Sequence, residues 1–199
     1  MIIGMSAGQG QGKSTLINEM CKIEGVRKLD LQTSREALAD WGYTLDEVNR
    51  YLPLKKQFQE ELFRRHTEAL DAASGESERN REVLFVERTF SDIFAYTALG
   101  LGAFNQYSEW LSEYKVKCIQ AQSNFEKVVF LTGRTYVPED DGVRSTNTDF
   151  SDTANFLIEK YTHEFSQDEF NHVATITVAN FEARTAILTK IVKDARERY

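Results

Sequence analysis

The sequence predicts an α/β protein built on a parallel sheet, because short apolar segments alternate along the chain with segments of helical periodicity. The five apolar segments have the length of strands, and they lie at residues 2–5, 27–31, 83–86, 127–131 and 174–178. Helical segments separate them, which favours parallel strands. The chain has 199 residues and 41% of them are apolar, so we expect one core and a single domain over residues 1–199.

The segments between the predicted strands carry helix signals. In the longest of them, Pro53 suits a first helical turn, and Phe58, Leu62 and Leu70 recur on one face. The polar segment 74–80 then predicts a loop before the third strand. The predicted helices are residues 14–20, 34–41, 53–73, 89–100, 104–122 and 152–166, with a closing helix after the last strand.

A phosphate-binding loop is predicted between the first strand and the first helix. Residues 7–15 read Ala-Gly-Gln-Gly-Gln-Gly-Lys-Ser-Thr, and the flanking strand and helix are the context that this motif requires. Its glycines let the backbone adopt positive φ and approach a phosphate chain, so that amide N–H groups surround the anion. The residues expected to contact the nucleotide are Gly8, Gln9, Gly10, Gln11, Gly12, Lys13, Ser14 and Thr15.

Three side chains of this motif have distinct expected roles. Lys13 supplies a mobile positive charge for the β- and γ-phosphates, and the Ser14 hydroxyl suits Mg²⁺. Thr15 is expected beside the α-phosphate. The motif therefore predicts a nucleotide, ATP, bound with Mg²⁺.

Charged residues follow the second and third predicted strands, and ligands of such sheets lie outside the carboxyl ends of the strands. Glu87 is placed to order Mg²⁺ and Arg88 to bind phosphate, or the two form a surface ion pair. Asp30 can accept the proton of an acceptor hydroxyl, or it is a turn or N-cap residue. Arg35 can hold an anionic group of the acceptor, or it lies on the surface.

A second polar loop, about residues 133–148, follows the fourth strand and contains two arginines. A mobile lid that excludes water and brings cationic charge to the transferred group is what phosphoryl transfer requires. Arg144 is the first candidate for this role and Arg134, next to the nucleotide, the second. A solvated polar loop is the alternative.

The composition limits the classes of partner. A net charge of −7 argues against a protein whose main partner is a nucleic acid, although it does not exclude local basic sites. Cys21 and Cys118 are far apart and show no zinc pattern, which predicts two reduced thiols. No signal peptide is recognised and no apolar run reaches 18 residues, so we expect a cytoplasmic protein without a membrane span.

Four segments together resemble the small AAA-type P-loop ATPase and kinase proteins of tailed bacteriophages. That group is related to nicotinamide riboside kinase and, more distantly, to nucleoside and thymidylate kinases. The resemblance implies a three-layer kinase core with five strands, ATP on the phosphate-binding loop, and the acceptor between the second strand and the helices after the third. The segments are residues 7–15, 33–36, 87–92 and 139–144.

The same resemblance implies that Asp92 and Tyr96 line the acceptor pocket, one and two helical turns after the Glu87-Arg88 pair. The residues alone are equally consistent with a helix N-terminal charge and a core aromatic.

Taken together, these features predict a phosphotransferase that uses ATP and Mg²⁺ and acts on a nucleoside, a nucleotide or a similar small acceptor. Two alternatives remain open: a kinase of a hydroxymethylated base in phage DNA, and an ATPase switch that transfers no phosphate to an acceptor. The oligomeric state is not predicted. The residues expected to carry the chemistry are Lys13, Glu87, Arg88, Arg144 and Asp30, with Ser14 and Glu87 at the metal.

Overall fold

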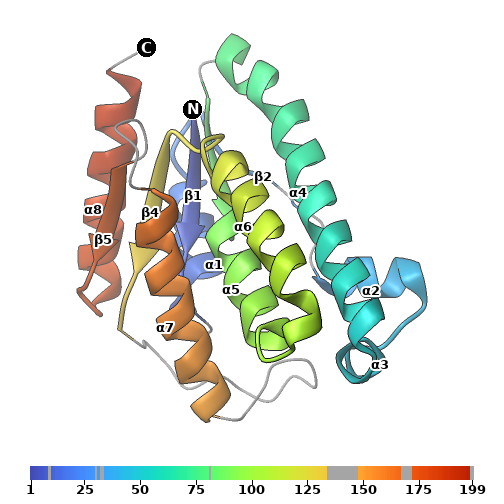
Figure 1. The fold of residues 1–199 in the computed structure, drawn as a ribbon. Helices are drawn as coiled ribbons and strands as arrows, with labels where there is room; N and C mark the ends of the chain where they lie inside the picture. Colours follow the sequence, from blue (N-terminus) through green and yellow to red (C-terminus); the bar gives the residue numbers. More distant parts are fainter. Residues whose placement is uncertain are drawn as a thin grey trace.

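A computed structural model describes residues 1–8, 10–29, 31, 34–80, 82–133, 148–166 and 172–197. Its core is one five-stranded sheet in the order β2-β3-β1-β4-β5, with every neighbouring pair parallel (Figure 1). This confirms the predicted α/β fold with a parallel sheet. The strands are β1 (Ile2–Ser6), β2 (Val26–Leu29), β3 (Val83–Glu87), β4 (Lys127–Leu131) and β5 (His172–Ile176).

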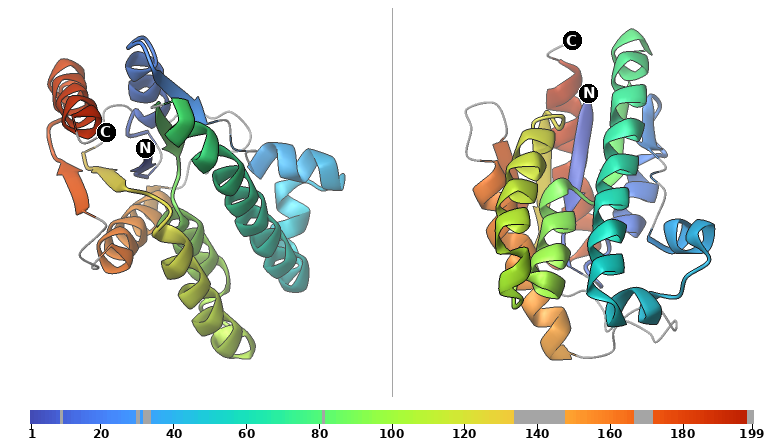
Figure 2. Two further views of the ribbon diagram at one scale, coloured as in Figure 1. Left: turned by 90° about the horizontal axis from the view of Figure 1, so that it is seen from above. Right: turned by 45° about the vertical axis from the view of Figure 1, so that its right-hand side comes forward.

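Helices cover both faces of the sheet, which makes the fold a three-layer arrangement (Figure 1; Figure 2). Helices α1 and α8 pack together on one face, and α4, α5, α6 and α7 lie on the other, while α2 and α3 pack against α4 beyond the edge of the sheet. None of the described helices combines the length and apolar composition that crossing a bilayer requires. The helices are α1 (Lys13–Met20), α2 (Ser34–Trp41), α3 (Leu45–Arg50), α4 (Leu52–Asn80), α5 (Phe90–Leu101), the 3-10 turn η1 (Asn105–Tyr107), α6 (Ser108–Gln122), α7 (Thr148–Phe165) and α8 (Phe181–Arg196).

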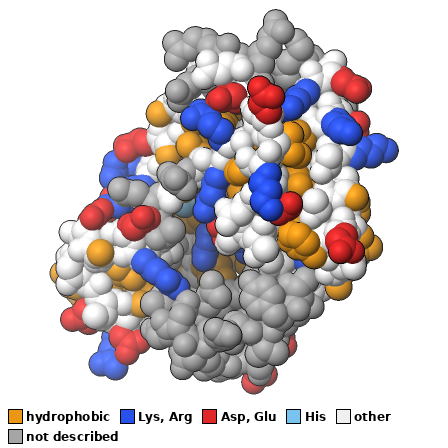
Figure 3. Space-filling view, turned by 180° about the vertical axis from the view of Figure 1, so that it is seen from behind, with side chains coloured by type: hydrophobic (Ala, Val, Ile, Leu, Met, Phe, Trp, Pro, Cys, Tyr) orange, Lys and Arg blue, Asp and Glu red, His pale blue; other side chains and the backbone are white. Residues whose placement is uncertain are grey.

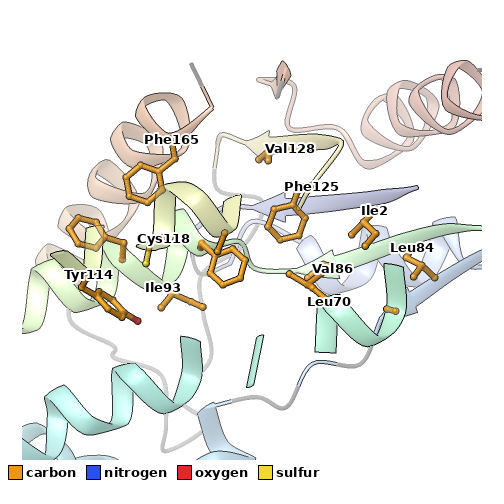
Figure 4. Close-up of a cluster of buried hydrophobic side chains, with 14 residues drawn as sticks. Ile2, Leu70, Leu84, Val86, Ile93, Tyr114, Cys118, Phe125, Val128 and Phe165 are labelled. Atoms are coloured by element: carbon orange, nitrogen blue, oxygen red, sulfur yellow. The ribbon is translucent and has the colours of Figure 1, made fainter. Parts of the chain in front are cut away.

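The two faces of the sheet have separate apolar cores, because successive side chains of a strand point to opposite faces. Ile2 and Val86 face α4, α5 and α6, where they join Phe125 and Cys118 in one buried cluster (Figure 4). Ile3, the next residue of β1, faces the other way into the cluster with α1 and α8. The three central strands β3, β1 and β4 are accordingly almost entirely buried and apolar, as expected for strands covered on both faces. Both cysteines of the chain are free thiols.

The central position of β1 determines where a ligand can bind. β1 lies between β3 and β4, so the loop that follows it opens between the ends of its two neighbours. In the β1–β3 register Met5 is opposite Glu87. Open parallel sheets usually bind their ligands at this place, outside the carboxyl ends of the strands.

The expected loop at residues 74–80 is wrong, because α4 continues without interruption to Asn80. Ala73 is buried, and Ser74 and Gly75 are exposed. No proline interrupts residues 74–80, and a helix needs no apolar face where it does not pack against a core. The polar composition therefore indicated exposure and not the end of the helix.

Two further differences concern local hydrogen bonds. Helix α3 was not predicted; it begins with a capping box in which Thr44 Oγ1 accepts from Glu47 N at 3.3 Å and Thr44 N donates to the Glu47 carboxylate at 2.7 Å. β5 spans residues 172–176 and not 174–178, and the carbonyl of Val178 accepts a hydrogen bond from Arg184 instead of a sheet partner.

Replacing Gly75 by alanine should stabilise the protein by about 0.5–1 kcal/mol, because Gly75 is inside α4 and a Cβ there meets nothing within 4 Å. Urea unfolding followed by circular dichroism measures the change. Gly42→Ala is the matched control: Gly42 also has open space but a φ of 71°, so alanine there should destabilise. A loss of stability in both variants would contradict a helix through Gly75.

Candidate functional site

The predicted phosphate-binding loop lies between β1 and α1, the context that its motif requires. Gly10 and Gly12 have φ values of 73° and 80°, the left-handed region in which a side chain is unfavourable. Lys13 Nζ folds back onto the loop and donates to the carbonyls of Ala7 at 2.6 Å and Gly8 at 2.9 Å. The loop is thus curved like an anion-binding loop, and its lysine is held against it by these two carbonyls.

Ser14 and Glu87 meet at the end of the sheet. The Ser14 hydroxyl donates to Glu87 Oε1 at 2.6 Å, and Lys28 Nζ lies 3.3 Å from Glu87 Oε2. Burial raises the pKa of Glu87, but the Ser14 hydrogen bond and the positive charges of Lys28 and Lys13 outweigh it, so the net pKa is lowered. Glu87 is therefore an ionised carboxylate at neutral pH. A hydroxyl and a carboxylate oxygen side by side are the hard ligands that Mg²⁺ prefers.

Arg88 has an unusual backbone, with a φ of 91° in a residue other than glycine. Such a conformation costs on the order of 1–3 kcal/mol and is concentrated at functional sites. Its N–H donates to the Met5 carbonyl at 3.1 Å, and its guanidinium lies 5.2 Å from the centre of the Tyr96 ring. The turn therefore directs Arg88 away from the path of β3 and onto α5.

Asp92 lies in the first turn of α5 and forms a capping box with the N-cap residue Thr89. Its carboxylate accepts from Thr89 N at 2.9 Å and from Thr89 Oγ1 at 2.7 Å, and only 1% of Asp92 is exposed. This geometry matches the alternative reading of Asp92 as a helix N-terminal charge. A role in acceptor binding remains a prediction.

A buried chain of hydroxyl groups leads from this cap to β1. Thr89 Oγ1 and Ser91 Oγ are 2.6 Å apart, Ser91 Oγ and Thr162 Oγ1 are 3.0 Å apart, and Thr162 Oγ1 and Ser6 Oγ are 2.9 Å apart. All four side chains are buried, so the hydroxyls satisfy one another in place of water. The network joins β1, α5 and α7. It was not predicted, because its members are far apart along the chain.

Arg184 is the second group that sequence reasoning missed. This arginine of α8 is fully buried and donates only to carbonyls: Val178 at 2.5 Å, Gln11 at 2.6 Å, Thr132 at 2.5 Å and Gly133 at 3.0 Å. It therefore ties together the phosphate-binding loop, the end of β4 and the turn before α8. A signal was available, since Arg184 occupies the buried face of an amphipathic helix where an apolar residue is expected.

His66 lies on the buried side of α4, against Phe90, with 5% of its surface exposed. Its Nδ1 lies 3.1 Å from the Leu62 carbonyl, which leaves Nε2 as an acceptor without a hydrogen-bond partner in the described part of the chain. Burial lowers the pKa of His66 to about 4, and the positive charge of Arg88 acts in the same direction. His66 is thus neutral at physiological pH.

Two predicted site residues are exposed. Arg35 is exposed in the first turn of α2, and Thr15 is exposed in α1. Among the described side chains, no cluster of three or more His, Cys, Asp or Glu residues forms a metal site. The predicted site residues that lie outside the described residues are Gln9, Asp30, Arg134 and Arg144.

One face of the molecule carries several positive charges near its middle. In the view from behind, Lys and Arg side chains gather there, with Asp and Glu side chains among them (Figure 3). The chain as a whole has a net charge of −7, so positive charge is gathered locally on an acidic protein.

Comparisons with known proteins agree with this geometry at the level of the fold. The chain has a TM-score of 0.68 and 15% identity to deoxyadenosine kinase from M. mycoides with the products dCMP and dCDP bound, covering 98% of this chain and 100% of the kinase. With dATP bound, the same kinase gives 0.67 and 14%, covering 97% and 100%. Thymidylate kinase from Candida albicans gives 0.60 and 14%, covering 98% and 92%. The chain therefore has the fold of P-loop nucleoside and nucleotide kinases.

Sequence comparison adds less. No protein-family model matches the chain. Among curated proteins, an uncharacterized lipoprotein of Mycoplasma pneumoniae (MG309 homolog) is 26% identical over 168 residues. That match covers 77% of this chain but only 13% of the length of the relative.

Arg184→Met should lower the free energy of unfolding by about 3 kcal/mol, because it removes the donor of the buried Gln11 carbonyl and of the partly buried Thr132 and Gly133 carbonyls. Arg184→Lys should lose less, since one ammonium group can satisfy part of the set. Urea unfolding provides the measurement, with Arg27→Met as control for an arginine whose side chain is 50% exposed. Equal stability of the Arg184→Met and Arg27→Met variants would contradict the anchoring role.

His66 should make the protein less stable as the pH falls. The imidazole has a pKa of about 6.5 in the unfolded chain and about 4 when folded, so below pH 6.5 the unfolded state binds more protons. The resulting loss is about 2 kcal/mol between pH 7 and pH 5. Unfolding free energies at both pH values should show a smaller difference for His66→Gln. The same difference in variant and wild type would refute the lowered pKa.

Proposed function

We propose that the protein is a phosphotransferase that uses ATP and Mg²⁺ and phosphorylates a nucleoside or a nucleotide. The observation that carries this proposal is the 2.6 Å hydrogen bond between Ser14 and Glu87, directly beside Lys13 and the curved loop. It brings the hydroxyl of a phosphate-binding motif and a carboxylate from a neighbouring strand to one point. Phosphoryl transfer needs little more from a protein than such positioning and charge neutralisation.

The donor half of the site rests on the loop and its lysine. Lys13 now donates to neutral carbonyls, whereas the β- and γ-phosphates of ATP offer charged acceptors, and charge-assisted hydrogen bonds are about twice as strong. Ser14 and Glu87 have the oxygen ligands to hold Mg²⁺, which supplies charge neutralisation at the phosphates when bound. Arg134 and Arg144 are proposed to add cationic charge from the lid.

The acceptor half is proposed around Arg88 and Tyr96 at the start of α5. Arg88 directly follows Glu87 at the end of β3. Its guanidinium lies over the ring of Tyr96, so its partner in that contact is an aromatic ring and not a carboxylate. A hydroxyl acceptor requires a base, for which Asp30 or Glu87 is proposed, and a monophosphate acceptor requires a cation such as Arg35. Asp92, in the first turn of α5, is also proposed to line this pocket.

The solved structures support the proposal through their fold. The deoxyadenosine kinase was determined with dCMP and dCDP and with dATP, so nucleotides bind to proteins of this architecture. The resemblance of the sequence motifs to the bacteriophage kinases also favours a phosphotransferase. We also propose that the protein acts in the cytoplasm.

Transfer of label from γ-labelled ATP is the decisive test. With Mg²⁺ and a panel of ribonucleosides, deoxynucleosides, their monophosphates, nicotinamide riboside and hydroxymethyluracil DNA, we expect label on one small acceptor. Lys13→Ala should reduce kcat/KM at least about 100-fold, because it removes a cation from the transferred group. Lys22→Ala, an exposed lysine just after α1, is the matched control and should retain activity.

The panel also separates the alternatives. Label on the DNA alone would indicate a base kinase. Free phosphate with every acceptor, lost in Lys13→Ala, would indicate an ATPase switch and contradict the proposed transfer. Equal activity of Lys13→Ala and Lys22→Ala would remove the phosphate-binding loop from the chemistry altogether.

A further inference from the structure

Arg184 holds the peptide unit that joins Gln11 to Gly12 in the phosphate-binding loop. Its Nη1 donates to the Gln11 carbonyl at 2.6 Å. The described part of the chain contains no cis peptide bond, so the carbonyl of Gln11 and the N–H of Gly12 point in opposite directions. Arg184 therefore fixes the direction of an N–H group that it does not touch.

The N–H of Gly12 is available to a ligand of the loop. Gly12 is the N-cap of α1, with a φ of 80° and a ψ of 18°, and Lys13 is the first residue of the helix. Within the described part of the chain, the Gly12 N–H donates to no acceptor. Amide groups at the start of a helix lack partners inside the helix and can bind an anion. Because it points away from Arg184, this N–H stays unobstructed by the side chain that orients it.

The other hydrogen bonds of Arg184 attach it to the sheet. Its Nη2 donates to the carbonyls of Thr132 at 2.5 Å and Gly133 at 3.0 Å, directly after β4. The N–H of Thr132 in turn donates to the Ile176 carbonyl of β5 at 3.0 Å. The Nε of Arg184 donates to the Val178 carbonyl at 2.5 Å. The guanidinium is therefore held in one orientation by backbone that continues two strands.

Only a guanidinium suits this position on α8. It is a planar group with five N–H donors in a fixed arrangement, so it can serve three backbone segments at once. Burying a cation is costly, and an apolar residue on the buried face of α8 would avoid that cost. What Arg184 adds over an apolar residue is the fixed geometry of the loop relative to the ends of β4 and β5.

We propose that Arg184 is a positioning residue for the donor nucleotide, which directs the Gly12 N–H toward the phosphates by holding the Gln11 carbonyl. The inference rests on the donor half of the proposed function, the binding of nucleotide phosphates by the loop, and not on the acceptor. A donor that is already oriented needs no rearrangement when the ligand binds. Removal of Arg184 therefore weakens phosphate binding in addition to lowering stability.

Affinities for two ligands test this role: ATP with Mg²⁺ and inorganic triphosphate with Mg²⁺, each measured by isothermal titration without an acceptor. Arg184→Met should weaken the binding of both ligands about tenfold or more, because one hydrogen bond to a charged group is misdirected. The two losses should be equal, since the effect lies at the phosphates and not at the base. Every titration is made well below the lowest melting temperature of the variants.

Two further variants separate direction from charge and from stability. Arg184→Lys keeps the positive charge, but one ammonium group cannot serve three segments, so both ligands should bind about three- to tenfold more weakly. Val192→Ala is the control on the same helix. Val192 is buried in the apolar cluster, so this variant should have a lower melting temperature and keep the wild-type affinities.

The amide signal of Gly12 in the NMR spectrum reports the hydrogen bond directly. Addition of triphosphate should shift this proton signal downfield in the wild type, because the N–H donates to a charged oxygen. The shift should be smaller in Arg184→Lys and unchanged in Val192→Ala. A purely structural role of Arg184 would leave it the same in all three proteins.

Three results would overturn the inference: wild-type affinities in Arg184→Lys, losses in Arg184→Met no larger than those in Val192→Ala, or a Gly12 signal that does not move in the wild type. If Arg184→Met does not fold, Arg184→Lys and the wild-type signal still decide. A wild-type protein that binds both ligands but transfers no phosphate would refute the proposed function and leave this test valid.

Discussion

The pairing of β1 with β3 is the constraint on which the rest of the site depends. Its register sets Met5 opposite Glu87, so the last carboxylate of β3 lies level with the start of the phosphate-binding loop. From there Glu87 reaches the Ser14 hydroxyl, and the next residue, Arg88, turns back to bond the Met5 carbonyl. A shift of one residue would point Glu87 to the opposite face of the sheet and separate these groups.

The main features of the fold followed from local sequence patterns, and the exceptions have local causes. Strands buried on both faces are continuous apolar runs, which a sequence reveals directly. The end of α4 was not visible in the sequence, because residues 74–80 lose the apolar periodicity while the helix continues. β5 was displaced by two residues because Arg184 takes the carbonyl of Val178, a contact that no local pattern encodes.

The candidate site was predictable where it depends on the ends of strands. Ser14 and Glu87 were expected to act together on that ground, and they form a hydrogen bond. Arg184 was not found, because the carbonyl of Gln11 that it contacts lies far from it in the sequence.

The hydroxyl network between α5 and β1 has a fixed polarity. Thr89 donates its only hydroxyl proton to Asp92, so Ser91 must donate to Thr89, Thr162 to Ser91, and Ser6 to Thr162. Every proton in the chain thus points away from β1 and toward one carboxylate. The negative charge of Asp92 thereby orients a dipole at the strand end that it never touches, and loss of that charge would free all four hydroxyls to reverse.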